Sequence, residues 1–115
     1  MSVITQLEGL IKSKNIASIK QIINEQANDA KPLTESKPVI NYLAQNITKL
    51  DNASTLDVCD HAIKMLKTRQ LQFDEEDTIF KKEMAEVLTA REEYEPAAKI
   101  LEAINLEQSN RDIKP

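Results

Sequence analysis

The only histidine of this 115-residue chain, His61, lies close in sequence to the only cysteine, Cys59, and to Asp57. These side chains are of the types that bind zinc or perform nucleophilic catalysis. Helix positions two residues apart point in different directions, so Cys59 and His61 do not share a metal. Asp57 and His61 are four positions apart and can form a charge-assisted pair, but two ligands do not make a zinc site. We therefore predict a structural His61, a buried Cys59 and no metal or other cofactor.

The acidic run at residues 74–77, Asp-Glu-Glu-Asp, is a second group of residues that could do chemistry. Calcium sites use loops that contain glycine and alternate their oxygen ligands, and this run has neither feature. Acidic side chains are favoured at the positive N-terminus of a helix, which explains the run without a cation. We identify no catalytic, cofactor-binding or metal-binding residue in the sequence.

The composition restricts the fold and the partners. The chain is 41% hydrophobic and 30% charged, has one glycine, and carries a formal net charge of −4. One glycine does not supply the turns of a β-sandwich or a phosphate-binding loop. The basic residues are interspersed with carboxylates, which disfavours nucleic acid, and no apolar run reaches the roughly 18–20 residues of a membrane span. We expect an all-α module of a reducing compartment, with no nucleic acid, membrane or small-molecule substrate as partner.

Apolar residues recur at helical spacing along almost the whole chain and predict six helices in three hairpins. The first helix is expected to end near Ser13, and the second to be capped by Asn15 and to end at 26–29. The third should begin near Thr34 or Ser36, with Pro38 in its first turn, and the fourth should be capped by Ser54. The fifth should run from about Asp77 to Glu92, and the sixth should begin at Pro96 and end near Gln108. In the third helix Val39, Leu43, Ile47 and Leu50 form the expected buried stripe. Hairpins of this length are typical of a right-handed α-α superhelix with repeats like those of tetratricopeptide (TPR) proteins.

The fifth and sixth helices carry the most specific packing pattern. Large and small residues alternate there at the spacing of a TPR-type helix pair, and the residues concerned are Met84, Ala85, Leu88, Tyr94, Ala97, Ala98, Leu101 and Ile104. Small residues such as Ala85 and Ala97 let two helices approach closely, while larger ones fill the groove with the next pair. Glu92 stands at the corner, where glycine is common.

Residues 73–107 carry a resemblance to a known family. The matching elements are Phe73-Asp74-Glu75-Glu76, Glu93-Tyr94, Ala97-Ala98 and Ile104-Asn105-Leu106-Glu107, in this order and spacing. This segment resembles the N-terminal helical-repeat region of the COP9 signalosome subunit 4 family. The Ile-x-Leu-Glu ending favours this family over the related non-catalytic subunit of the proteasome lid. The alternative is a helical-repeat adaptor of another assembly, such as the lid.

The resemblance implies a scaffold and not an enzyme. In that family the helical repeats precede a winged-helix PCI domain, and the complex removes the ubiquitin-like protein NEDD8 from cullins with a metal centre in a different subunit. The implied partners are other signalosome subunits and cullin–RING ligases, in the cytoplasm and nucleus. Because 115 residues leave no room for a PCI domain, we expect residues 1–115 to be the N-terminal helical-repeat region of a longer subunit. A chain with one histidine does not supply the ligands of the catalytic metalloprotease.

Overall fold

The computed structural model describes residues 2–69 and 72–112, and side chains as far as Ile104. The described residues form α-helices and two short 3-10 helices, with no β-strand among them. The bounds are α1 Val3–Ser13, α2 Ile16–Ala27, α3 Leu33–Asn46, η1 Ile47–Lys49, α4 Asn52–Met65, η2 Leu66–Arg69, α5 Asp74–Ala90 and α6 Tyr94–Asp112. The expected all-α fold of helical hairpins is confirmed.

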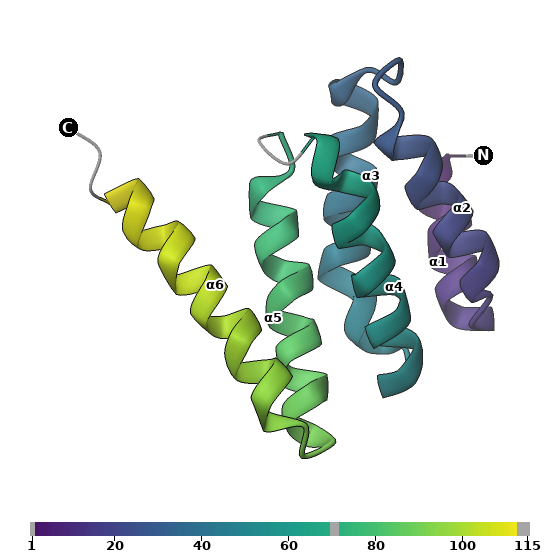
Figure 1. Ribbon diagram of the computed structural model, residues 1–115. Helices are drawn as coiled ribbons and strands as arrows, with labels where there is room; N and C mark the ends of the chain where they lie inside the picture. Colours follow the sequence, from purple (N-terminus) through teal and green to yellow (C-terminus); the bar gives the residue numbers. More distant parts are fainter. Residues whose placement is uncertain (1, 70–71, 113–115) are drawn as a thin grey trace.

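The helices stand side by side in a stack (Figure 1). Helices α1 and α2, α2 and α3, α4 and α5, and α5 and α6 pack as consecutive neighbours, while α3 and α4 are connected through η1. Further packing joins α2 to α4, α1 to α3, and α5 to α3. Helix α6 differs from the others because its packing is almost entirely on α5. In Figure 1 it diverges from the stack toward its C-terminal end.

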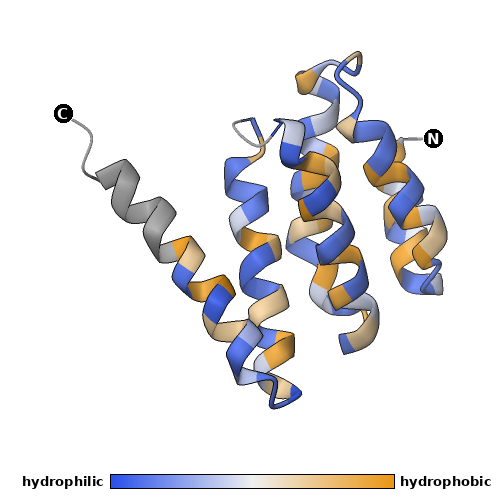
Figure 2. Cartoon of the chain, viewed as in Figure 1, coloured by the Kyte–Doolittle hydropathy of each residue, from blue (hydrophilic) through white to orange (hydrophobic). Residues whose placement is uncertain are grey.

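A continuous apolar core holds α1 to α5 together. The predicted stripe Val39, Leu43, Ile47 and Leu50 is buried, and so are both phenylalanines of the chain, Phe73 and Phe80. The stripe is not contained in one helix as predicted, because α3 ends at Asn46, so that Ile47 lies in η1 and Leu50 follows it. Figure 2 shows apolar residues on the sides of the helices that face one another and polar residues on the outer sides. This is the arrangement that amphipathic helices produce when they bury one face.

Helices α1 and α5 both end in a C-terminal motif that usually contains glycine, but neither has a glycine there. After α1, Lys14 adopts φ 57°, and the Asn15 N–H donates to the Leu10 carbonyl at 2.9 Å. After α5, Glu92 adopts φ 63°, and the Glu93 N–H donates to the Leu88 carbonyl at 2.8 Å. These are Schellman motifs, in which the left-handed residue is usually glycine. The structure therefore accounts for the position of Glu92 where glycine is common.

Several predicted helix limits are corrected. Asn15 caps α2 as expected, but Asp51 and not Ser54 caps α4, because its carboxylate accepts the Ser54 N–H at 2.8 Å. Helix α5 begins and ends earlier than predicted, and α6 begins two residues before Pro96 and continues past Gln108.

Pro38 lies inside α3 and not in its first turn. The helix begins at Leu33 because Pro32 precedes it with extended backbone and its carbonyl accepts the N–H groups of Glu35 and Ser36. Pro38 is then the sixth residue, where its missing N–H removes one intrahelical hydrogen bond.

Candidate functional site

Cys59 is fully buried in the core on α4. Burial, with a smaller contribution from the charge of Glu83, raises the pKa of its thiol to about 12. The reactive form of cysteine is the thiolate, so this thiol stays protonated and unreactive at neutral pH. Cys59 therefore acts as a small apolar core residue.

His61 and Asp57 both contact α2 and do not pair with each other in this structure. The His61 imidazole Nε2 lies 2.7 Å from Oδ1 of Asn24, and the Asp57 carboxylate lies 2.7 Å from Nζ of Lys20. These two contacts connect α2 and α4 along their outer sides. Among the described residues no three His, Cys, Asp or Glu side chains are grouped so that they could hold a metal.

The eight residues of the predicted packing pattern divide between interior and surface. Ala85, Leu88, Ala97 and Ile104 are buried, and Met84 is half-buried. Ala98 is exposed, Tyr94 is 61% exposed and Leu101 is 45% exposed. The exposed members belong to α6, which has α5 on one side and no comparable packing against α4 among the described residues.

The acidic run at the start of α5 contains a buried charge that sequence reasoning missed. The Glu76 side chain is fully buried, with Lys37 Nζ 3.1 Å from Oε2 and Asn41 Nδ2 donating to Oε1 at 3.3 Å. Asp77 is also buried and forms an ion pair with Lys81 at 2.8 Å. The run begins a helix as expected, but Glu76 also pairs with a basic residue of α3, while Asp77 pairs within α5 itself.

Arg69 joins this region to the first hairpin. Its Nη1 donates to the carbonyls of Gln26 at 2.9 Å and of Asn28 at 3.2 Å. Its guanidinium carbon lies 5.4 Å from the Phe73 ring centroid, and Lys37 Nζ lies 5.7 Å from the same centroid. Both cations are within the range of cation–π attraction. The hydrogen bonds of Arg69 to Gln26 and Asn28 have no signal in the sequence, because these residues are 43 and 41 positions away.

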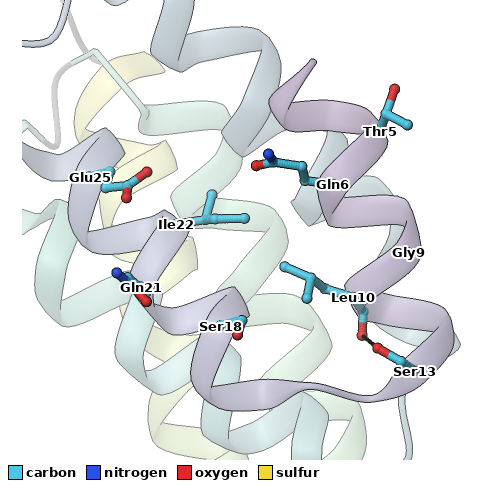
Figure 3. Close-up of a pocket in the computed structure, with 9 residues that line it drawn as sticks. All are labelled: Thr5, Gln6, Gly9, Leu10, Ser13, Ser18, Gln21, Ile22 and Glu25. Atoms are coloured by element: carbon cyan, nitrogen blue, oxygen red, sulfur yellow. Dashed lines mark hydrogen bonds between the residues drawn. The ribbon is translucent and has the colours of Figure 1, made fainter. Parts of the chain in front are cut away.

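A groove of about 540 Å³ runs between α1 and α2 (Figure 3). The apolar side chains of Leu10 and Ile22 lie along it, and most of its other lining residues are polar. Gly9, the only glycine of the chain, also lines it, and a Cβ atom at Gly9 would meet nothing within 4 Å. The groove therefore offers both hydrogen-bonding and apolar contacts, which are the contacts of a binding surface.

A second groove, of about 300 Å³, lies between α4, α5 and α6. Ile63, Met84 and Ile100 provide apolar walls, with Asp60 on the α4 side and Lys99 on the α6 side. It lies where α6 and α4 do not pack closely, so it follows from the divergence of α6.

In the part of the chain that the structure describes, no helix is both long enough and apolar enough to cross a membrane.

The chain is similar to COP9 signalosome complex subunit 4 from three organisms. It is 27% identical to the Emericella nidulans protein over 79 residues, which is 69% of this chain and 19% of the relative. It is 20% identical to the Arabidopsis thaliana protein over 107 residues, or 93% of this chain and 27% of the relative. It is 23% identical to the Dictyostelium discoideum protein over 109 residues, or 95% of this chain and 28% of the relative.

The resemblance noted at residues 73–107 is thus confirmed, and it extends over most of the chain. The chain spans between about a fifth and somewhat over a quarter of the length of these curated relatives. No protein-family model matches it, and no solved structure matches it.

Proposed function

We propose that this chain is a non-catalytic scaffold module of a COP9 signalosome subunit 4. The observation that carries the proposal is that relatives from three distant organisms are all the same subunit and that two of them align with more than nine-tenths of the chain. In this proposal the chain is the helical-repeat portion, and the PCI domain belongs to the remainder of the subunit. Its partners are other signalosome subunits and the cullin–RING ligases from which the complex removes NEDD8, in the cytoplasm and nucleus.

The chemistry of the described residues supports binding rather than catalysis. The thiol of Cys59 is protonated, His61 is hydrogen-bonded to Asn24, and the buried carboxylate of Glu76 is paired with Lys37. These groups connect helices of the stack. A stack of helical hairpins presents an extended surface for protein contacts, which is the usual role of such architectures.

The proposal is tested by affinity purification of the gene product that contains this chain, expressed at its native level. We expect the other signalosome subunits to co-purify in comparable amounts, and the preparation to remove NEDD8 from a cullin. A variant with Leu7→Asp, which places a charge at a fully buried core position, should lose this association because the first hairpin unfolds. Recovery of proteasome-lid subunits in place of signalosome subunits, or of neither, would contradict the proposal.

A further inference from the structure

Tyr94 lies exposed at the corner between α5 and α6. It is 61% exposed, although the sequence predicts it to pack, and its hydroxyl has no hydrogen-bond partner among the described residues. The other tyrosine of the chain, Tyr42, is half-buried and packs against the core. The packing of the stack therefore leaves the phenol of Tyr94 accessible from solvent.

The chain on both sides of Tyr94 is also accessible. Residues 89–96 are all exposed, and this is the longest exposed run in the described part of the chain. Pro96 has no N–H, and the hydrogen bond from the Ala97 N–H to the Glu93 carbonyl is long, at 3.4 Å. Because α6 packs almost entirely on α5, its first turn opens at lower cost than a turn inside the stack. An enzyme can therefore hold several residues on each side of Tyr94.

Acidic side chains surround Tyr94. Glu92 and Glu93 precede it, Glu95 follows it, and Arg91 is the nearest basic residue in the sequence. Arg91 pairs with Glu93 at 3.1 Å, but both side chains remain close to half exposed, so this ion pair is weak. Protein kinases select their substrates partly by such charge patterns around the acceptor residue. The corner therefore offers both an accessible hydroxyl and an acidic pattern for recognition.

We propose that Tyr94 is a phosphorylation site for a tyrosine kinase that prefers acidic residues before the acceptor. In the transfer, Oη of Tyr94 attacks the γ-phosphorus of ATP, and the bond from this phosphorus to the bridging oxygen breaks. ADP leaves with the electrons of that bond, and the phenol proton passes to a carboxylate of the kinase.

The phosphate adds a charge of about −1.5 to −2 to a corner that already carries Glu92, Glu93 and Glu95. Its oxygens are strong hydrogen-bond acceptors, so the modified corner suits an arginine-rich surface of a partner protein. This inference does not depend on membership of the signalosome, because it concerns only groups of this chain.

The first test incubates the whole chain with ATP and the purified catalytic domain of a tyrosine kinase that prefers acidic substrates. Mass spectrometry should locate one phosphate on Tyr94, and Tyr94→Phe should abolish its incorporation. Tyr42→Phe is the matched control and should leave the incorporation unchanged, because Tyr42 is half-buried and has no acidic neighbour within four positions. A chain that takes no phosphate on Tyr94, or takes it as readily on Tyr42, would overturn the proposal.

The second test replaces the two acids that precede the acceptor. Glu92→Gln together with Glu93→Gln should lower kcat/KM of the kinase for the chain by about tenfold. The control is Glu8→Gln together with Glu102→Gln, which removes two exposed carboxylates away from the corner and should lower kcat/KM by less than about twofold. Equal losses would mean that only net charge is recognised, and no loss would mean that the acids before Tyr94 play no part. Either outcome contradicts the proposal.

Discussion

Lys37 Nζ lies 3.1 Å from Oε2 of Glu76 and joins α3 to the first turn of α5 across 39 positions of sequence. The same ammonium donates to the Gln72 carbonyl at 2.6 Å. Because the Glu76 side chain is fully buried while Lys37 reaches the surface, the lysine brings its charge to an acid that water does not reach. The pair fixes where the third hairpin begins relative to the second.

Replacing Lys37 with Met should lower the free energy of unfolding by about 2–3 kcal/mol. The loss is large because, among the described residues, it leaves the buried carboxylate of Glu76 with Asn41 as its one side-chain hydrogen-bond partner. Urea denaturation monitored by circular dichroism measures this change in the free energy of unfolding.

The control for this prediction is Lys12→Met, which removes an exposed ion pair with Glu8 and should change stability by less than about 0.5 kcal/mol. The double variant Lys37→Met with Glu76→Leu should recover most of the loss, since no buried charge remains. Equal effects of Lys37→Met and Lys12→Met would contradict the role given to the buried pair.

Ala97→Leu should destabilise the third hairpin by about 1–3 kcal/mol. Ala97 is buried in α6, whose packing partner is α5, so a larger side chain must push the two helices apart. Ala98→Leu is the matched control, because the neighbouring alanine is exposed and has room for the added atoms. Thermal unfolding of both variants measures the difference, and identical melting temperatures would argue against close packing at Ala97.

Glu92→Gly should stabilise the chain by about 0.5–1 kcal/mol. At φ 63° a side chain crowds its own backbone, and glycine removes this strain while keeping the hydrogen bonds of the motif. Lys14→Gly, at φ 57°, should act in the same way. Glu92→Ala retains the strain and serves as the control, with little change expected. A loss of stability on Glu92→Gly would show that the Glu92 side chain makes a contact worth more than the strain.

Glu83 makes the stability of the chain depend on pH. Burial, and then the nearby charge of Glu86 and its hydrogen bond, raise the pKa of the Glu83 carboxyl above its usual 4.5. A raised pKa means that the folded state favours the protonated form. Its contribution to stability is therefore complete below about pH 4.5 and is lost as the pH rises through the raised pKa.

Glu83→Gln mimics the protonated form and should increase stability at pH 7 by about 0.5 kcal/mol after solvent screening, with little change at pH 4. Glu86→Gln should give a smaller gain by removing the neighbouring charge. Denaturation curves at the two pH values measure both effects. A gain for Glu83→Gln that is the same at pH 4 and pH 7 would mean that titration of the carboxyl is not its cause.

The helices and their buried faces were predictable because they follow from local periodicity. Val39 and Leu43 recur at helical spacing in α3, and burying them needs only that the helix has a neighbour. The cap of α4 was harder to predict, since Asp51 and Ser54 are both good capping residues and lie three positions apart. Local chemistry allowed two starting points, and the contact of the Asp51 carboxylate with the Ser54 N–H distinguishes them.

The buried polar groups were not predictable, because their partners are remote in sequence. In the sequence, Glu76 does not differ from any other acid at a helix N-terminus, and only the fold brings Lys37 beside it. Gln26 follows the polar pattern expected at the end of a helix, yet it lies wholly inside the stack. The exposure of Tyr94 and Leu101 likewise depends on how far α6 diverges from α4, which hairpin periodicity does not determine.

The dependence of α6 on a single neighbour has a consequence for how the chain opens. In a stack of repeats, stability is shared mainly between adjacent units, so an element with one neighbour opens at lower cost than those with two. Backbone amides of α6 should therefore exchange with deuterium before those of α4, which lies between α2 and α5. Opening of the stack then begins at α6, and the backbone amides in the core around Phe73 and Phe80 exchange with deuterium last.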